Sequence, residues 1–174
     1  PDRHLDIGSR IDGFVAHVAA FRKIEVTDIR ALRSNVDNIK FVQSDITKLD
    51  NSLIDKYDSI SSLHAIEHIG LGRYGDTVDP NGHLLAFTNI IAMTRPGGKI
   101  YLGLPFSKVT QIHFNASRIF SLVYILKEFI ESNDLTLVCF DYVDDEGFLH
   151  QDRNIKQVSS LDIKYGCAIL TLQK

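Results

Sequence analysis

Short apolar segments alternate with segments of helical periodicity, and this alternation constrains the fold more than any other feature of the chain. Helical spacing of apolar residues begins after Ser9, spans about 83–94 and begins again after Ser121. Ser9 and Asp12 fit a capping box, which predicts that the first helix begins just after Ser9. The segments that read as strands are 4–7, 24–28, 39–42, 57–63, 99–104, 135–140 and 165–172.

Strands that alternate with helices predict a parallel sheet with helices on both faces. No helix can be read between the last two strands, so these two are expected to pair antiparallel. The segment 105–120 reads as a long irregular loop, and 79–82 reads as a turn with proline at its second position. The predicted fold class is α/β, a Rossmann-like, doubly wound, mostly parallel seven-stranded sheet with an antiparallel last strand.

Length and charge limit the classes of function. The 174 residues fit one domain, and 19 basic against 22 acidic side chains give a net charge of −3. No Lys/Arg cluster or long apolar run occurs, so we expect no nucleic-acid partner and no membrane partner. Cys139 and Cys167 lie in apolar runs and are expected to be small core residues in a reducing compartment, although a pair of cysteines can also form a disulfide. We therefore predict a cytoplasmic protein.

The stretch 61–82 places the most chemically active side chains on flexible backbone. Four of the chain's eleven glycines fall within it. Binding and catalytic residues concentrate on loops that a rigid scaffold positions. We interpret this stretch as the reactive edge of a small-molecule enzyme, carrying His64, Glu67, His68, Arg73, Tyr74 and Asp76.

The ends of the predicted strands indicate a ligand that contains adenosine. In an open sheet, ligands bind beyond the carboxyl ends of the strands, and Asp28 at such an end is the residue type that accepts hydrogen bonds from a ribose diol. The first loop has Arg10 where a dinucleotide fingerprint has its second glycine, and Asp12 places negative charge where phosphates would lie. These residues favour S-adenosylmethionine over NAD, because backbone N–H groups after Gly8, together with Arg10, can meet its carboxylate.

Five short motifs extend along the chain: Leu5-Asp-Ile-Gly8, Asp28, Ser44-Asp45-Ile46, His64-Ala-Ile-Glu-His68 and Pro96-Gly-Gly98. Together they resemble the motif series of class I S-adenosylmethionine-dependent methyltransferases, and the resemblance covers nearly the whole chain. It implies the methyltransferase type of α/β fold, with Asp28 at the ribose and with Asp45 and Ile46 at the adenine. It also implies that the methionine part of the cofactor lies near Gly8 and its neighbours. Ser9, Arg10, His64 and Asp6 are the further candidate cofactor-binding residues, and Asp6, inside the first strand, can instead have a structural role.

Two further segments narrow this resemblance. His68-Ile-Gly-Leu-Gly-Arg-Tyr-Gly-Asp76 and Phe114-Asn-Ala-Ser-Arg118 are similar to a branch known only as a domain of unknown function. The wider family usually carries helices before the first strand that help to cover the cofactor, whereas this chain begins almost at its first strand. The expected domain, 1–174, therefore lacks those cap helices.

His64, Glu67 and His68 also match His-x-x-Glu-His, a pattern of zinc hydrolases. That pattern needs a continuous helix to place both histidines on one face, and here two glycines follow at once. A divalent ion held with the help of His113 is a weaker alternative than a hydrogen-bonded, structural His68. We therefore assign no metal site.

The other candidates also have structural interpretations. Asp28 and Asp45 can be turn formers at strand ends. Arg73, Tyr74 and Asp76 can lock their own loop through an internal ion pair. The joint placement of the two aspartates at strand ends favours the ligand interpretation for them.

The sequence thus predicts an S-adenosylmethionine-dependent methyltransferase that acts by O-methylation on a small polar or sugar-like acceptor, such as a glycan precursor. Methyl transfer is an in-line displacement, so positioning is the main task, and histidine suits the role of general base. Two alternatives are a non-catalytic binding domain of the same fold and an NAD(P)-dependent oxidoreductase. The candidate catalytic residues are His64, Glu67, His68 and His113, and the candidate acceptor-binding residues are Arg73, Tyr74, Asp76, Asn115 and Arg118.

Overall fold

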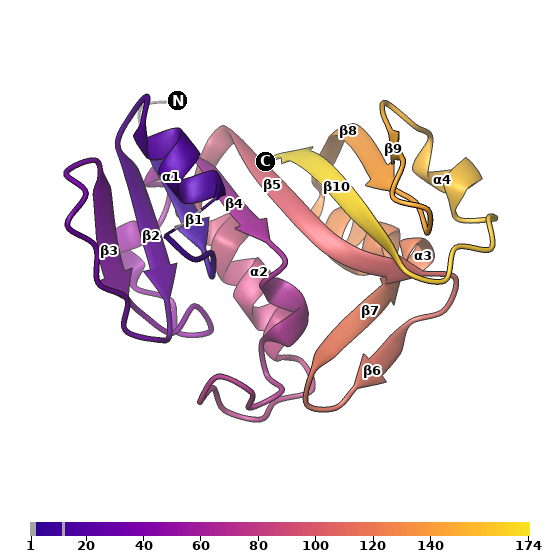
Figure 1. Ribbon diagram of the computed structural model, residues 1–174, viewed down its shortest axis with the longest axis horizontal. Coiled ribbons are helices and arrows are strands. Elements are labelled where there is room, and N and C mark those ends of the chain that lie inside the picture. The colour runs from indigo at the N-terminus through magenta and orange to yellow at the C-terminus, as the bar shows by residue number, and fades with distance from the viewer. Residues whose placement is uncertain (1–2, 12) are drawn as a thin grey trace.

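The structure is a computed structural model and describes residues 3–11 and 13–174. Within these residues ten strands form a sheet (Figure 1). Eight of them follow the order β3-β2-β1-β4-β5-β10-β8-β9, and the other two, β6 and β7, form a hairpin in which β7 pairs with β5. The strands are β1 His4–Ile7, β2 Ile24–Asp28, β3 Ile39–Gln43, β4 Tyr57–Leu63, β5 Thr94–Ser107, β6 Gln111–His113, β7 Ser117–Ser121, β8 Thr136–Val143, β9 Leu149–His150 and β10 Gly166–Gln173.

The direction of the strands confirms the predicted fold class. Strands β3, β2, β1, β4 and β5 are all parallel to their neighbours. The last strand, β10, lies between β5 and β8 and is antiparallel to both. All seven predicted strands are present, and β6, β7 and β9 are short additions to them.

Helices cover both faces of the sheet. Figure 1 shows α1 in front of the sheet and α2 and α3 behind it. The small core on the α1 side includes Val15, Ala19 and Val26. The larger core on the other side includes Phe87 of α2 and Phe129. The helices are α1 Phe14–Ala19, α2 Gly82–Met93, α3 Leu122–Tyr124 with a π-helical continuation Ile125–Ile130, α4 Ile155–Val158, and the 3-10 turns Asn51–Leu53, Ile66–His68 and Glu131–Asn133.

Two local predictions are confirmed. The hydroxyl oxygen of Ser121 accepts a hydrogen bond from the backbone N–H of Tyr124 at 3.2 Å, as expected of a helix N-cap. The Gly82 N–H donates to the carbonyl oxygen of Asp79 at 3.0 Å, which closes the turn over 79–82. In the part of the chain that the structure describes, no helix combines the length and the apolar character needed to cross a membrane.

Other local predictions are wrong. The first helix begins at Phe14, with Gly13 as its N-cap, and not just after Ser9; Asp12, the other half of the expected capping box, lies outside the described residues. The segment 105–120 is not an irregular loop, because β5 continues to Ser107 and the β6–β7 hairpin follows. The hairpin depends on pairing that local periodicity does not reveal: β7 runs parallel to the end of β5, with Phe120 opposite Phe106.

Candidate functional site

A pocket lies at the carboxyl edge of the sheet, where the segments that follow β1, β2, β3 and β4 meet. This is the edge at which open α/β sheets bind ligands. The structure brings eight of the residues singled out in the sequence to this one pocket: Gly8, Asp28, Asp45, Ile46, His64, His68, Tyr74 and Asp76.

Gly8 forms the turn after β1. Its φ is +79°, and a Cβ at this position would lie 2.5 Å from the Cβ of Ala65. Its N–H donates to the carbonyl oxygen of Thr27 at 2.8 Å, which holds the turn against β2. Only glycine fits here, and its bare backbone lines the pocket.

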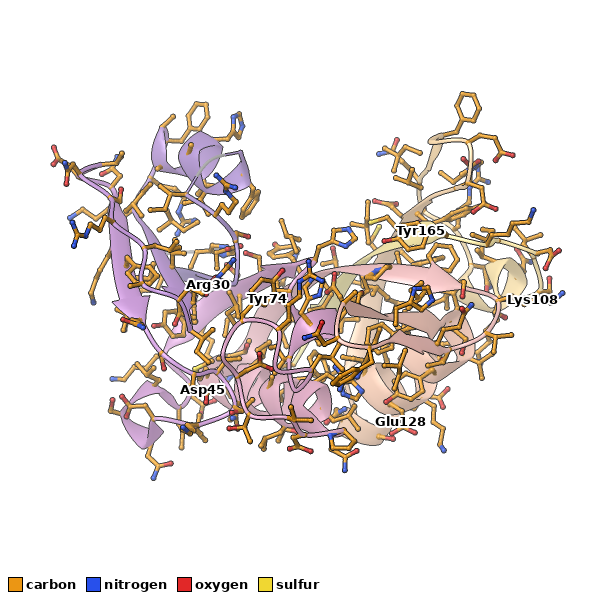
Figure 2. The ribbon with its side chains drawn as sticks, turned by 60° about the horizontal axis from the view of Figure 1, so that its bottom comes forward. Arg30, Asp45, Tyr74, Lys108, Glu128 and Tyr165 are labelled. Atoms are coloured by element: carbon orange, nitrogen blue, oxygen red, sulfur yellow. The ribbon has the colours of Figure 1, made fainter. Side chains whose placement is uncertain are left out.

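Asp28 ends β2 and is 6 % exposed. The guanidinium of Arg30 donates to both of its carboxylate oxygens, at 2.9 and 2.6 Å. Arg30 also lies over the ring of Tyr74, 4.5 Å from its centroid, and Figure 2 shows the two side chains side by side. Sequence reasoning missed Arg30, although an arginine two residues after an acidic strand end is a signal that could have identified it.

Asp45 follows β3, and its side chain caps the turn that begins there. Its Oδ1 accepts hydrogen bonds from the N–H and the hydroxyl of Thr47, at 3.0 and 2.6 Å. Lys48 lies 3.3 Å from its other oxygen. Burial raises the pKa of this carboxyl, but the hydrogen bonds from Thr47 and Lys48 outweigh burial, so the pKa is lowered. Asp45 therefore faces the pocket as a carboxylate beside Ile46.

His64 follows β4 in a left-handed conformation, with φ +56°. Its Nδ1 lies 3.2 Å from Oε1 of Glu67, and its Nε2 lies 3.2 Å from Sγ of Cys167. Hydrogen bonds to Cys167 and then to Glu67 raise the pKa of His64 to about 10, against the opposing effect of burial. At neutral pH His64 is therefore an imidazolium. Sequence reasoning missed Cys167, and no local signal marks it, because it is 103 positions away from His64.

His68 is the second pocket histidine. Its Nδ1 lies 2.6 Å from the carbonyl oxygen of Ala116, and a carbonyl only accepts, so Nδ1 carries the proton. The other ring nitrogen, Nε2, is then the one that can accept a hydrogen bond. Its ring packs edge-on against Tyr74, with 5.6 Å between centroids. Glu67 lies behind both histidines, 1 % exposed and not among the residues that line the pocket.

Asp76 holds the glycine-rich loop closed. Its Oδ2 accepts from the N–H groups of Gly70 and Gly72, at 2.7 and 3.1 Å, and its Oδ1 accepts from the Tyr74 N–H at 3.1 Å. Gly70 has φ +82°, and a Cβ there would lie 2.1 Å from the carbonyl oxygen of Asp79. The loop is thus locked through backbone N–H groups rather than through an ion pair with Arg73, whose guanidinium lies over the Tyr74 ring.

Arg118 comes from β7 and is 2 % exposed. Its guanidinium donates to the carbonyl oxygens of Ile69 and Pro80, at 2.6 and 3.1 Å, and makes longer contacts of 3.4 Å with those of Glu67 and Asp79. Burial lowers the pKa of Arg118, against the raising effect of nearby carboxylates. The structure therefore places Arg118 beneath the loop, as a residue that positions backbone and does not face the pocket.

The remaining candidates lie outside the pocket lining. Asp6 is fully buried, accepts from the Ser61 hydroxyl at 2.5 Å, and has its pKa raised by burial against an opposing hydrogen bond from Ser9. The other candidates outside the pocket lining are the half-buried Ser9 and four exposed residues, Arg10 beyond the first turn, Arg73 on the loop, and His113 and Asn115 in the β6–β7 hairpin. Among residues 3–11 and 13–174, no three His, Cys, Asp or Glu side chains are placed to hold a metal ion.

Comparison with solved structures identifies the fold. The N1-methyltransferase of 1,6-didemethyltoxoflavin from Burkholderia thailandensis, solved with S-adenosylhomocysteine, is similar over 100 % of this chain and 71 % of its own, with a TM-score of 0.69 and 16 % identity. The N-methyltransferase NodS from Bradyrhizobium japonicum, also solved with S-adenosylhomocysteine, is similar over 99 % and 78 %, with a TM-score of 0.61 and 14 % identity. The [4+2]-cyclase SpnF is similar over 99 % and 75 %, with a TM-score of 0.70 and 12 % identity.

These identities are low, so the likeness shows a shared fold and not a shared reaction. No curated protein matches the sequence. One family model does match, over residues 14–156, which is most of the chain. The chain therefore belongs to the family described as Caenorhabditis protein of unknown function, DUF268.

Proposed function

We propose that the pocket binds S-adenosylmethionine and that the protein transfers its methyl group to a small polar acceptor. One observation carries the proposal: the acidic side chains that end β2 and follow β3 line the same pocket as Gly8. The ends of the neighbouring parallel strands β2 and β3 meet at one edge of the sheet, and the support for a ligand is that Asp28 and Asp45 both line a hollow there beside the bare backbone of Gly8. Solved neighbours of the same fold bind S-adenosylhomocysteine, which supports this choice of ligand.

The residues present fit such a ligand. Gly8 leaves bare backbone at a point that a Cβ could not occupy, so a ligand can approach it closely. The Asp28 carboxylate can accept hydrogen bonds from a ribose diol, provided that it shares its oxygens with Arg30. Ile46 offers an apolar contact for an adenine ring beside Asp45.

The bound cofactor would supply an electrophilic methyl group on a sulfonium, and the protein's own residues orient the acceptor and take its proton. Of the two pocket histidines, His68 suits the role of general base, because its Nε2 is an acceptor. His64 does not suit that role, because it is already protonated at neutral pH. Transfer to a hydroxyl oxygen would move the hydroxyl proton to Nε2 of His68.

A small, polar or sugar-like acceptor fits the side chains at the pocket rim. Tyr74 and Asp76 line the pocket, and they supply a phenol hydroxyl and a carboxylate that a polar acceptor can contact. The exposed residue Arg73 belongs to the 64–82 loop, and the exposed residue Asn115 is next to Ala116 of the β6–β7 hairpin, whose carbonyl oxygen contacts the pocket residue His68. We therefore place acceptor recognition on these residues and assign Arg118 to the support of the loop.

The proposal is tested by titration calorimetry with S-adenosylhomocysteine. We expect a measurable heat for the wild type and a loss of affinity of at least about tenfold in Asp28→Ala, since a buried acceptor would be lost. Asp162→Ala removes an exposed carboxylate far from the pocket residues and serves as the matched control, with unchanged affinity. No heat at high protein concentration, or equal affinity in the two variants, would rule the proposal out.

A parallel titration with NAD and NADP separates the oxidoreductase alternative. Heat with these nucleotides and none with S-adenosylhomocysteine would reverse the assignment. Binding of S-adenosylmethionine without methyl transfer to any small hydroxyl compound in an acceptor panel would leave a binding domain of the same fold, and would contradict the catalytic half of the proposal. SpnF shows that this fold also occurs in a protein named for a different reaction.

A further inference from the structure

We infer that Cys167, His64 and Glu67 form a nucleophilic thiol centre at the pocket edge, whose substrate is a small molecule with an electrophilic carbon. The centre consists of three side chains in a row: Sγ of Cys167, the imidazole of His64 and the carboxylate of Glu67, with 3.2 Å at each junction. A cysteine next to an imidazolium that a third group orients is an arrangement used in covalent catalysis. It involves no adenosyl ligand and is independent of the proposed function.

The backbone explains how residues from two distant strands meet. Cys167 lies on β10, and His64 follows β4, with β5 between these two strands. The strand β5 carries Gly103 beside the imidazole, where a Cβ would be in ordinary van der Waals contact with Cδ2 of His64, at 3.7 Å. The His64 N–H donates to the Gly103 carbonyl oxygen at 2.9 Å, which fixes the left-handed turn that directs the ring across β5. Strained backbone of this kind is found at functional sites.

Glu67 is independent evidence that this cluster holds a positive charge on His64. It is 1 % exposed, its Oε1 lies next to His64, and its Oε2 has no hydrogen-bond partner among the described residues. A buried carboxylate is costly unless a positive charge compensates it. His68 is a more distant neighbour, with Nε2 3.7 Å from Oε1. The protonated form of His64 is therefore the natural partner of Glu67.

The chemistry follows from this pairing. The thiol of Cys167 releases its proton to water, and the resulting thiolate lies beside the imidazolium of His64, 3.2 Å from Nε2, which stabilises its charge. With an alkyl halide the sulfur forms the new S–C bond, and the halide leaves with the bonding electron pair. With an α,β-unsaturated carbonyl compound the sulfur adds to the β-carbon, and the proton held by His64 passes to the α-carbon. Both reactions balance without a further co-reactant. His64 is 49 % exposed and Cys167 is half-buried, so a small molecule can reach them.

The second cysteine of the chain is an internal control. Cys139 on β8 is also half-buried, but the polar side chain beside it is Asp141, whose Oδ1 lies 3.5 Å from its Sγ. Burial raises the pKa of Cys139, and the neighbouring carboxylate raises it further. One chain thus presents a thiol next to a histidine and a thiol next to a carboxylate.

The test is alkylation of the folded full chain at pH 7 with iodoacetamide and, separately, with acrylamide, followed by peptide mass spectrometry. We expect Cys167 to react about tenfold faster than Cys139, because the thiolate is the reactive form. Equal rates at the two cysteines, or a faster rate at Cys139, would overturn the inference.

Two variants separate the role of the cluster from simple access. In His64→Asn, which retains a residue type that tolerates positive φ, the Cys167 rate should fall about tenfold while the Cys139 rate stays constant. In Glu67→Gln, which keeps the shape of the side chain, the fall should be smaller and confined to Cys167. A variant that loses its fold will show faster labelling of both cysteines, in which case the other variant decides. An unchanged Cys167 rate in a folded His64 variant would contradict the inference.

Discussion

Two walls of the pocket are held by different kinds of interaction. The β2 wall, formed by Asp28 and Arg30, is held by an ion pair between side chains two residues apart, and the Arg30 side chain is 40 % exposed. The β4 wall, residues 64–82, is held from beneath by Arg118 and from within by Asp76, through bonds to the backbone. The β2 wall is held by a local contact with an exposed arginine, whereas the β4 wall is held by the buried Arg118 from a strand far along the chain.

This difference fits what each wall has to do. In the proposed function the Asp28 carboxylate exchanges Arg30 for a ribose diol, and an ion pair whose arginine side chain is 40 % exposed is easily displaced. Histidines that hold or accept protons must keep a fixed geometry, which buried hydrogen bonds provide. The predictions that follow test whether the two walls differ in this way.

Arg118→Met should have the largest effect, a loss of about 3–5 kcal/mol in the free energy of unfolding, because it leaves buried carbonyl oxygens of the β4 wall without a donor. Urea unfolding provides the measurement. Arg153→Met, at an exposed arginine, is the matched control and should change stability by less than about 0.5 kcal/mol. Similar losses in the two variants would show that the β4 wall is not held by Arg118.

The second prediction concerns pH. Burial, followed by the charge of Arg118, lowers the pKa of His83 to about 4, from 6.5. The unfolded chain takes up this proton first as the pH falls, so stability is lost between pH 6.5 and pH 4, by about 3 kcal/mol for this one histidine. His4, buried and with its pKa also about 4, contributes a similar loss over the same range.

His83→Gln should therefore remove about half of the loss that the two histidines cause over that range. The measurement is urea unfolding of wild type and variant at pH 7, 5.5 and 4. A difference in stability between the two proteins that does not change with pH would show that His83 is not held neutral in the fold.

Asp76→Asn should cost about 1–2 kcal/mol, because an amide offers one acceptor oxygen in place of the two that serve the N–H groups of the loop. Hydrogen exchange of the Gly70, Gly72 and Tyr74 amides is the direct measurement, and all three should exchange faster. Unaltered protection of these amides would mean that the loop is closed by something other than the carboxylate.

Arg30→Met should have the smallest effect on stability, about 0.5–1 kcal/mol, because the Arg30 side chain is 40 % exposed and the Asp28 carboxylate keeps the hydrogen bond from the backbone N–H of residue 30, at 2.7 Å. It should also strengthen the binding of S-adenosylhomocysteine about threefold, because Asp28 no longer has to exchange a partner. Thermal unfolding and calorimetry measure the two effects. A large loss of stability here would remove the distinction between the walls.

Local patterns predicted the strands of the sheet well but missed the β6–β7 hairpin. The seven predicted strands are short runs rich in apolar residues, which local composition reveals, and all are present. The hairpin residues gain their structure from the pairing of Phe120 opposite Phe106, which joins two separate segments. The predicted start of the first helix is too close to the N-terminus. Serine is a common N-cap residue, which favours Ser9, but the helix begins after Gly13.

The sequence by itself determined the class of fold and the edge at which the pocket lies, because strand and helix periodicities and the acidic strand ends are local properties of the chain. Only the tertiary structure decided which side chains meet. Cys167 reaches His64 across Gly103, and Arg118 lies under a loop that begins some fifty residues earlier. Such contacts depend on strand order and on the space that neighbouring side chains leave. Neither can be predicted from the spacing of residues along the chain.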